Sequence, residues 1–204
     1  MHVIEIDRES VAYLKQHFPQ LNNIYEEDFL KAGIESRFSE KFNIIGNFPY
    51  NISSQILFKV LDNRNQVVEL VGMFQKEVAQ RCAEKPGSKE YGILSVFLQA
   101  FYNVEYLFSV KPGVFNPPPK VTSAVIRLTR NDIEKLNCDE KLFWQVVKAG
   151  FNQRRKTLRN ALSSLVSKES MTDDPMFDLR AERLSVDDFV KMTNLINTSR
   201  INAV

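Results

Sequence analysis

The chain has 204 residues, and 27 lysines and arginines face 25 acidic residues, so its formal net charge is only +2 at pH 7. Hydrophobic residues make up 44% and charged residues 25%, the mix of a soluble globular protein of one ordinary domain and a small second one. No apolar run approaches the roughly 20 residues of a membrane-spanning helix, and the charged start "MHVIEIDRES" lacks a signal-peptide pattern.

Strands and helical patterns alternate along the chain up to about residue 130. The expected strands cover residues 2–7, 22–30, 42–47, 66–75, 104–110 and 121–128. The expected helices cover 10–18, 53–62 and 92–102, with Ser10 capping the first and Ser53 or Ser54 the second. This alternation predicts an α/β domain on a mostly parallel sheet, whose last two strands form a pair.

The composition changes after Arg130. A polar, linker-like stretch at 131–140 precedes three helical patterns, at 140–151, 156–166 and 185–196. Ser185 and Asp188 fit a capping box at the start of the last pattern. We therefore divide the chain into an α/β domain of residues 1–130 and a helical domain of residues 131–204.

The two cysteines, Cys82 and Cys138, and the two histidines, His2 and His17, are far apart in the sequence. Their spacing fits no metal centre, so we expect no bound metal. Distant, unpaired cysteines are typical of free thiols in a reducing compartment, and we expect a cytoplasmic protein.

Three expected strands end in polar side chains, at the place where open α/β sheets bind ligands. Glu5 and Asp7 end the first strand, Asp28 the second and Asn47 the third. A carboxylate at such a strand end commonly accepts hydrogen bonds from a ribose diol, and Asp28 is equally suited to the amine of an adenine ring. A single acid at a strand end more often caps a helix or lies in a solvated turn. The evidence is therefore the occurrence of polar side chains at three strand ends together.

The segment "NIIGNFPYNIS" places Asn47, Phe48, Pro49 and Tyr50 directly after an apolar strand. Because a proline holds the preceding residue extended, the Phe48 carbonyl has a set direction beside the Asn47 amide oxygen. Two such acceptors suit the two hydrogens of an exocyclic amine and the charge that develops on its nitrogen. Tyr50 offers a face for base stacking. The alternative, a simple bend, is disfavoured by the strand-end position.

"NIIGNFPYNIS" is similar to the Asn-apolar-Pro-Tyr motif of amino-methyltransferases that use S-adenosylmethionine. Further segments resemble the ribosomal RNA adenine dimethyltransferase family, and within it the bacterial small-subunit type; they lie at 74–81, 88–96, 114–128 and 151–162. The resemblance covers nearly the whole chain. It implies a Rossmann-like class I methyltransferase sheet with a small C-terminal all-helical domain.

The resemblance implies an enzyme of ribosome biogenesis, which uses S-adenosyl-L-methionine to dimethylate N6 of two adjacent adenosines near the 3′ end of small-subunit (16S) rRNA. It implies that Glu5 holds the cofactor ribose and that Asp28, with Phe29 beside it, holds the cofactor adenine. It also implies that Asn47 touches both the cofactor and the target N6.

Tyr50 and Phe115 are implied to stack on the two faces of the target base, which must be flipped out or unpaired. The basic segment at 151–160 carries four cations: Arg154, Arg155, Lys156 and Arg159. Such a cluster alone is typical of a solvated helix face, but in this family context we expect it to bind the RNA backbone. The expected partner is the small ribosomal subunit, and the expected state is a monomer.

The chain lacks the G-x-G-x-G turn and the first strand that the resemblance implies, and its seven glycines are scattered. In this topology the first strand lies at the centre of the sheet. We therefore expect an N-terminally truncated, inactive fragment that binds S-adenosylmethionine poorly. Its sheet should show a gap or an unpaired edge beside residues 3–7 and 43–47.

Other functions fit parts of the sequence. An erythromycin-resistance type of methyltransferase, which acts on large-subunit rRNA, has similar motifs, but segments 117–125 and 152–160 favour the small-subunit type. A non-catalytic RNA-binding ribosome assembly factor, or a relative of mitochondrial transcription factors, fits the absent glycine-rich turn. A DNA adenine methyltransferase is disfavoured, because Asn47 stands where those enzymes usually carry an acid.

Overall fold

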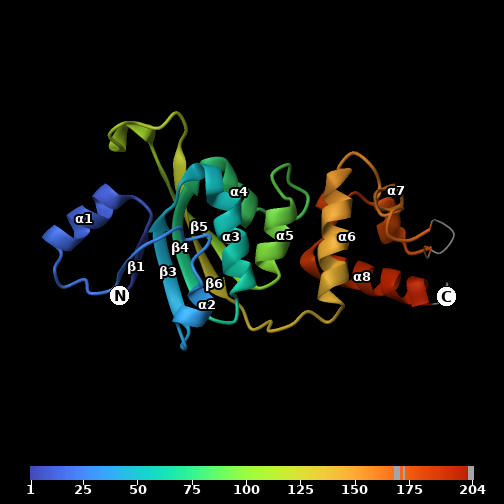
Figure 1. The fold of residues 1–204 in the computed structure, drawn as a ribbon. Helices are drawn as coiled ribbons and strands as arrows, with labels where there is room; N and C mark the ends of the chain where they lie inside the picture. The colour runs from blue at the N-terminus through green and yellow to red at the C-terminus, as the bar shows by residue number, and fades with distance from the viewer. Residues whose placement is uncertain (168–170, 172, 202–204) are drawn as a thin grey trace.

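The computed structural model describes residues 1–167, 171 and 173–201. Its strands are β1 (Val3–Glu5), β2 (Ile24–Glu26), β3 (Phe42–Asn47), β4 (Val67–Gln75), β5 (Tyr102–Val110) and β6 (Ser123–Arg130). Its α-helices are α1 (Arg8–His17), α2 (Ile34–Arg37), α3 (Ser53–Asp62), α4 (Lys76–Ala83), α5 (Ile93–Gln99), α6 (Glu140–Asn152), α7 (Leu158–Ala161) and α8 (Val186–Ile201). Short 3₁₀ turns are η1 (Tyr50–Ile52), η2 (Pro112–Val114), η3 (Pro175–Asp178) and η4 (Ala181–Arg183). Figure 1 shows the strands on one side of the molecule and α6 to α8 on the other.

All six expected strands form, but they make two separate sheets. β1 pairs with β2 in parallel, and the other four strands are ordered β3-β4-β6-β5. β3 and β4 are parallel, whereas β6 runs antiparallel to both β4 and β5. The sheet is therefore mixed rather than mostly parallel, because the chain turns back after β5 and inserts β6 antiparallel between β4 and β5. The predicted pairing of the last two strands is confirmed.

The two sheets meet at unpaired edges. Within the described residues neither β1 nor β3 has a partner on its second side, and Figure 1 shows β1 beside the edge of the larger sheet. On β3, the Ile45 side chain is 84% exposed. The expected gap beside residues 3–7 and 43–47 is confirmed, and it leaves backbone groups on both edges free to accept a further strand.

Two predicted helix caps were wrong. Asp7 caps α1, since its carboxylate accepts a hydrogen bond of 2.8 Å from the Ser10 amide; an acid nearer the strand outcompetes the serine. At α3 the residue before the helix is Ile52, which has no capping side chain. The Ser53 hydroxyl turns back to the Tyr50 carbonyl instead, at 2.9 Å.

The helical segment that was expected at 156–166 is shorter than its pattern. α7 covers only four residues, Leu158–Ala161. The Ser163 hydroxyl donates to the Asn160 carbonyl, and the Leu165 amide bonds to the Leu162 carbonyl three residues earlier. Serines that bond to nearby backbone groups favour turns over continued helix. The predicted capping box is confirmed, because the Ser185 amide and the Asp188 carboxylate are 2.9 Å apart and the reciprocal bond is 3.2 Å.

One hydrophobic core cluster runs from the larger sheet into the helical part. Its junction is aromatic: the ring centroids of Phe97, on α5, and Trp144, on α6, are 3.9 Å apart. A salt bridge of 2.7 Å between Arg64 and Glu140 crosses the same junction. The sheet ends at Arg130 and α6 begins ten residues later, but the division into domains at residue 130 stays a prediction. In the described ranges, no helix is both long and apolar enough to cross a membrane.

Replacing Phe97 with alanine should lower the free energy of unfolding by about 3–5 kcal/mol, because it leaves a cavity in this buried junction. Trp144 is the single tryptophan of the chain, so its fluorescence reports on the junction directly. We expect fluorescence and far-UV circular dichroism to show one common transition. Phe108→Ala is the matched control, since that ring is 56% exposed and its loss should cost little. Equal losses in both variants would contradict this account of the core.

Candidate active site

The carboxylates that were predicted at the ends of β1 and β2 are oriented by the main chain. One oxygen of Glu5 accepts from the Asp7 amide at 2.8 Å, and one oxygen of Asp28 accepts from the Leu30 amide at 2.9 Å. In the part of the chain that the structure describes, the second oxygen of each carboxylate has no hydrogen-bond partner. Each acid is thus held in place with one acceptor available to a ligand, which fits the hydroxyls of a ribose and the amine of an adenine.

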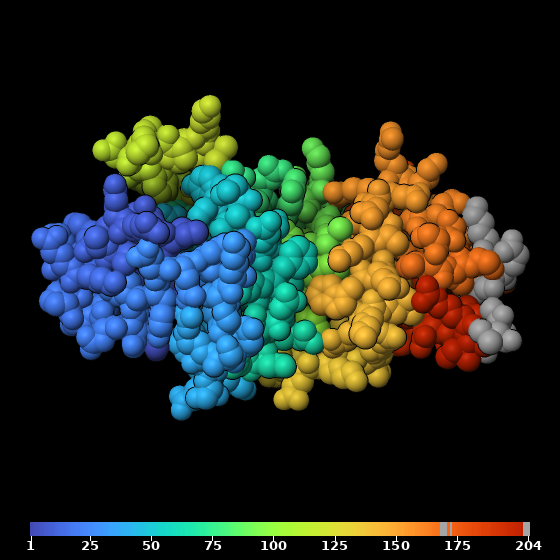
Figure 2. Space-filling view, in the orientation of Figure 1, coloured from blue at the N-terminus to red at the C-terminus, as the bar shows by residue number. Residues whose placement is uncertain are grey.

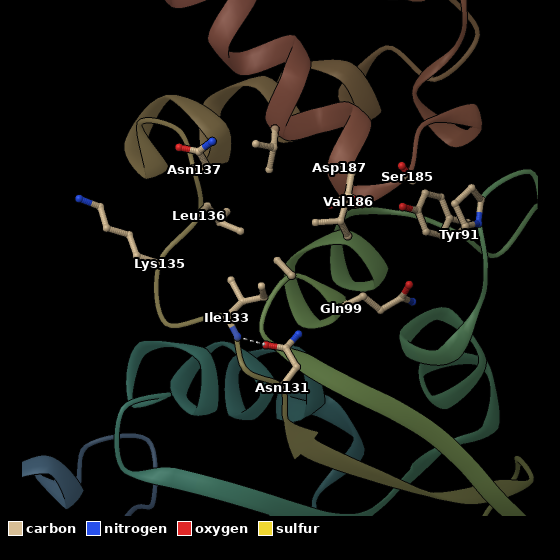
Figure 3. Close-up of a pocket in the computed structure, with 13 residues that line it drawn as sticks. Tyr91, Gln99, Asn131, Ile133, Lys135, Leu136, Asn137, Ser185, Val186 and Asp187 are labelled. Carbon is tan, nitrogen blue, oxygen red and sulfur yellow. Dashed lines mark hydrogen bonds between the residues drawn. The ribbon is translucent and has the colours of Figure 1, made fainter.

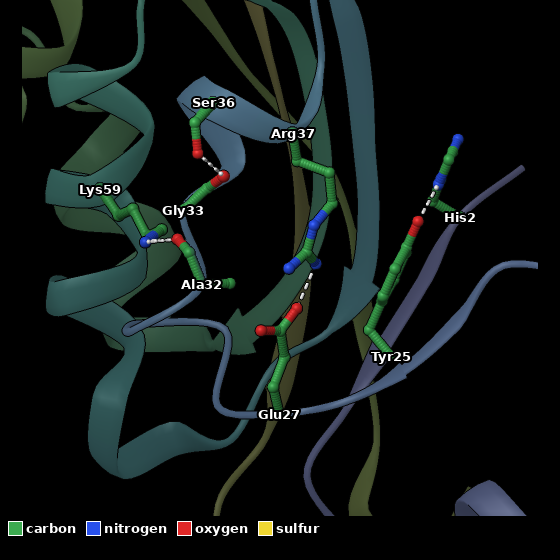
Figure 4. A network of polar contacts seen from close by, with 8 residues as sticks. All are labelled: His2, Tyr25, Glu27, Ala32, Gly33, Ser36, Arg37 and Lys59. Atoms are coloured by element: carbon green, nitrogen blue, oxygen red, sulfur yellow. Dashed lines mark hydrogen bonds and ion pairs between the residues drawn. The ribbon is translucent and has the colours of Figure 1, made fainter.

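A polar network holds the segment that carries Asp28 and Phe29 (Figure 4). The Lys59 ammonium, on α3, donates to the Leu30 carbonyl at 3.0 Å and to the Ala32 carbonyl at 2.6 Å. On the other side, Arg37 forms an ion pair with Glu27. The hydrogen bond from Arg37 keeps the pKa of the Glu27 carboxyl below its ordinary value. Lys59 thus ties the segment between β2 and β3 to α3, and the Arg37–Glu27 pair joins its two ends to each other.

Two paired glycines form the surface on which the Asn47–Tyr50 motif packs. Gly46 of β3 lies opposite Gly72 of β4. A Cβ on Gly46 would come within 2.8 Å of the Phe48 ring, and a Cβ on Gly72 within 2.7 Å of it. Phe48 can therefore fold back onto the bare backbone of the two strands. There it stacks on Phe74, with 5.2 Å between ring centroids.

The same ring connects the motif to the predicted cofactor segment, because the centroids of Phe29 and Phe48 are 6.4 Å apart. Asn47 lies at the very end of β3, in register with Met73, and is exposed. Pro49 is extended, with φ −59° and ψ 132°, and the 3₁₀ turn η1 follows it. The structure thus brings the Asp28–Phe29 segment close to an Asn-Phe-Pro segment whose Asn47 is exposed to solvent.

Tyr50 is held at both ends. Its carbonyl accepts from the Ser53 hydroxyl at 2.9 Å, and its phenol forms a hydrogen bond with the hydroxyl of Ser123, the first residue of β6. The ring itself is half-buried. The ring is therefore partly accessible while its outer end is fixed.

Phe115 lies in the connection between β5 and β6, after the short turn η2. Figure 2 shows this yellow-green connection standing above the N-terminal elements. The described residues include no ring contact between Phe115 and Tyr50. The enclosure of a base by these two aromatics stays a prediction.

The four predicted RNA-binding cations separate into two groups. Arg154 donates to the Lys89 carbonyl at 2.5 Å, and Arg159 is paired with Asp178 at 3.0 Å. The side chains of Arg155 and Lys156 are exposed and make no hydrogen bond or ion pair within the described residues. Arg154 and Arg159 thus anchor the segment, while Arg155 and Lys156 present free charge.

A cavity of about 530 Å³ lies elsewhere, between α5, the linker after β6 and the start of α8 (Figure 3). None of the predicted site residues lines it. The Tyr91 side chain is fully buried at its edge, its hydroxyl has no partner among the described residues, and burial raises its pKa above the ordinary value. Among the described residues, no group of three or more His, Cys, Asp or Glu side chains could hold a metal ion.

Sequence reasoning missed the residues that support the motif: Gly46, Gly72, Lys59, Ser53 and Ser123. The two glycines had a visible signal, since each interrupts an apolar strand at a point where backbone or a ligand must approach closely. Nothing local marks Ser123, because its bond joins positions 73 residues apart.

The mixed sheet, with an Asn-Phe-Pro-Tyr segment at the end of β3 and carboxylates at the ends of β1 and β2, defines a class I methyltransferase fold. A sequence profile described as ribosomal RNA adenine dimethylase matches residues 1–198. The chain belongs to this family.

Among similar curated proteins, one from Cytophaga hutchinsonii is 60% identical over 96% of this chain and 76% of its own length. One from Flavobacterium johnsoniae is 54% identical over 98% of this chain and 78% of its own length. Both are named Ribosomal RNA small subunit methyltransferase A.

Two solved structures share the fold. A dimethyladenosine transferase from Plasmodium falciparum has a TM-score of 0.79 at 24% identity, covering 97% of this chain and 82% of its own. The 23S rRNA methyltransferase ErmE has a TM-score of 0.66 at 21% identity, covering 94% of this chain and 80% of its own.

Gly72→Ala should lower the free energy of unfolding by about 1–3 kcal/mol, because the new methyl group collides with the Phe48 and Phe74 rings. Gly113→Ala is the matched control, since a Cβ there meets nothing within 4 Å. Denaturant unfolding of both variants measures the difference. A Gly72→Ala protein as stable as the Gly113→Ala protein would show that the packing at Gly72 has room for a methyl group.

Proposed function

We propose that this protein dimethylates N6 of two adjacent adenosines near the 3′ end of 16S rRNA, with S-adenosylmethionine as methyl donor, during assembly of the small ribosomal subunit. The observation that carries the proposal is the exposed Asn47 at the end of β3, followed by Phe48, whose ring centroid lies 6.4 Å from that of Phe29 in the Asp28–Phe29 segment. Relatives at 53–60% identity bear the small-subunit name, which favours this substrate over large-subunit rRNA.

S-adenosylmethionine, when bound, supplies a methyl group on a sulfonium centre. The free oxygen of Glu5 is suited to its ribose diol, and that of Asp28 to its adenine amine, with Phe29 against the adenine ring. These assignments rest on the orientation of both acids by main-chain amides. Lys59 would act indirectly, by fixing the main chain just after Phe29.

At the target base, the Asn47 amide oxygen and the Phe48 carbonyl would accept hydrogen bonds from the two N6 hydrogens. Held in this way, the nitrogen would keep its lone pair out of conjugation with the ring and available for the new bond to carbon. The same two oxygens would stabilise the positive charge that develops on the nitrogen, until one N6 proton leaves to solvent. Tyr50 and Phe115 would stack on the flipped base, as RNA-binding proteins commonly do with unpaired bases.

Replacing Asn47 with alanine should lower kcat for methyl transfer by about 10²–10³-fold, the usual effect of losing one preorganised hydrogen-bonding group at a reacting centre. Asn43→Ala is the matched control, because Asn43 is exposed on the same strand, away from its carboxyl end. The assay follows labelled methyl groups into undermethylated small subunits. Equal activity of the two variants would remove Asn47 from the chemistry.

This assay needs two forms of the protein. One is the 204-residue chain, and the other carries upstream the strand and glycine-rich turn of the family, taken from the C. hutchinsonii relative. The open edges of β1 and β3 lead us to expect transfer and micromolar cofactor binding only in the extended form. Tight binding of S-adenosylmethionine by the 204-residue chain would overturn that expectation. Transfer by neither form would favour a non-catalytic RNA-binding assembly factor.

Arg155→Ala and Lys156→Ala should each weaken RNA binding and reduce the slope of log K against log salt by about 0.7–0.9, because each removes one phosphate contact. Lys15→Ala is the control: α1 lies at the other end of the molecule from the helical part (Figure 1). Binding of a 16S rRNA fragment at several salt concentrations measures the slopes. An unchanged slope in both variants would place the RNA backbone elsewhere.

A further inference from the structure

The hydrogen bond between the Tyr50 phenol and the Ser123 hydroxyl joins two strands that are not neighbours. Tyr50 follows β3, Ser123 begins β6, and β4 lies between them in the sheet. Ser123 is in register with Gln75, the last residue of β4. The tyrosine side chain therefore reaches across the carboxyl end of β4, in the same region where Asn47 ends β3.

This hydrogen bond restrains the Tyr50 side chain, whose rotation the main-chain contacts do not restrict. The Ser53 hydroxyl holds the Tyr50 carbonyl at 2.9 Å, but it does not restrain rotation of the side chain. Ser123 is fully buried, so its hydroxyl has a single well-defined position to offer. A phenol that is bonded at its outer end keeps one ring orientation, and ring orientation determines where a base can stack.

Ser123 also ends the connection that carries Phe115. The residue before it, Thr122, accepts a hydrogen bond of 2.9 Å from the Lys76 amide through its carbonyl, which ties the base of that connection to the start of α4. The same point of the structure thus anchors both Tyr50 and the loop that carries Phe115.

We propose that Ser123 is a positioning residue for methyl transfer, which holds the Tyr50 ring in the orientation that aligns the target adenine with Asn47. This inference rests on the proposed function. Because the proposed function assigns binding of the subunit to charges such as Arg155 and Lys156, Ser123 acts on alignment after binding. Its loss therefore lowers kcat and leaves KM for the subunit nearly unchanged.

The test is a double-mutant cycle with Ser123→Ala, Tyr50→Phe and the combined variant, in the form of the protein that transfers methyl groups. Each single variant should lose about 3- to 10-fold in kcat, the usual effect of one hydrogen bond. The combined variant should lose no more than either single one, because both changes remove the same bond. Tyr50→Phe alters a half-buried side chain and keeps its ring, so it guards against misfolding of the serine variant.

Ser109→Ala is the matched control. Ser109 makes the same kind of bond, 2.7 Å to the Tyr106 phenol, on the outer strand β5. Its loss should leave kcat and KM unchanged. Thermal unfolding of all variants checks that the active fraction is the same.

The outcomes separate this inference from the proposed function. A non-additive loss in kcat, absent in Ser109→Ala, supports Ser123 as a positioning residue. Full activity of Ser123→Ala, or losses that multiply in the combined variant, overturns it while leaving the proposed function intact. If the unsubstituted protein transfers no methyl group in either form, the proposed function fails and the inference fails with it.

Discussion

The rest of the site depends on the close approach of one aromatic ring to bare backbone. Gly46 and Gly72 face each other across β3 and β4, and the Phe48 ring occupies the space that two side chains would fill. The Phe48 ring packs back over the strands, and the chain stays extended through Pro49 until the 3₁₀ turn η1 begins at Tyr50. Asn47 remains exposed at the strand end, and the Tyr50 side chain reaches Ser123 across the end of β4. The space left by the two glycines thus seats the ring that lies between these two residues in the sequence.

The charged segment at the start of the helical part combines two uses of arginine. Arg154 and Arg159 donate to groups of the chain itself, a main-chain carbonyl and the Asp178 carboxylate. The planar guanidinium group has several N–H donors and suits such directional bonds. The two arginines thereby hold the residues between them in place. Arg155 and Lys156 lie between these anchors with their charges in solvent. Fixing a short segment at two points reduces the conformational entropy that a polyanion must remove when it binds.

The sequence was sufficient for what is local and periodic. Alternating apolar strands, the motif at the end of β3 and the capping box at Ser185 follow from residue type and spacing alone, and the structure has them where they were expected. Competition between nearby groups was harder to predict, as Asp7 displacing Ser10 at the α1 cap shows. Contacts between distant positions could not be predicted from the sequence, because the hydrogen bond between Tyr50 and Ser123 depends on strand order and register. The roles of the predicted site residues, from Glu5 and Asp28 to Asn47, Tyr50 and Phe115, remain predictions.

The unit of β1, α1 and β2 is held by little apolar surface. Its buried side chain Val11, with Ala32 and Ile34 just beyond β2, lies outside the core cluster that joins the larger sheet to the helices. Regions with few buried contacts open at lower free energy than a core, so amide protons here should exchange before those of β4 or β6. Glu5 sits on this unit. A ligand that contacts Glu5 binds only the conformations in which this unit is packed in place. Its apparent affinity is therefore reduced by the fraction of molecules in those conformations.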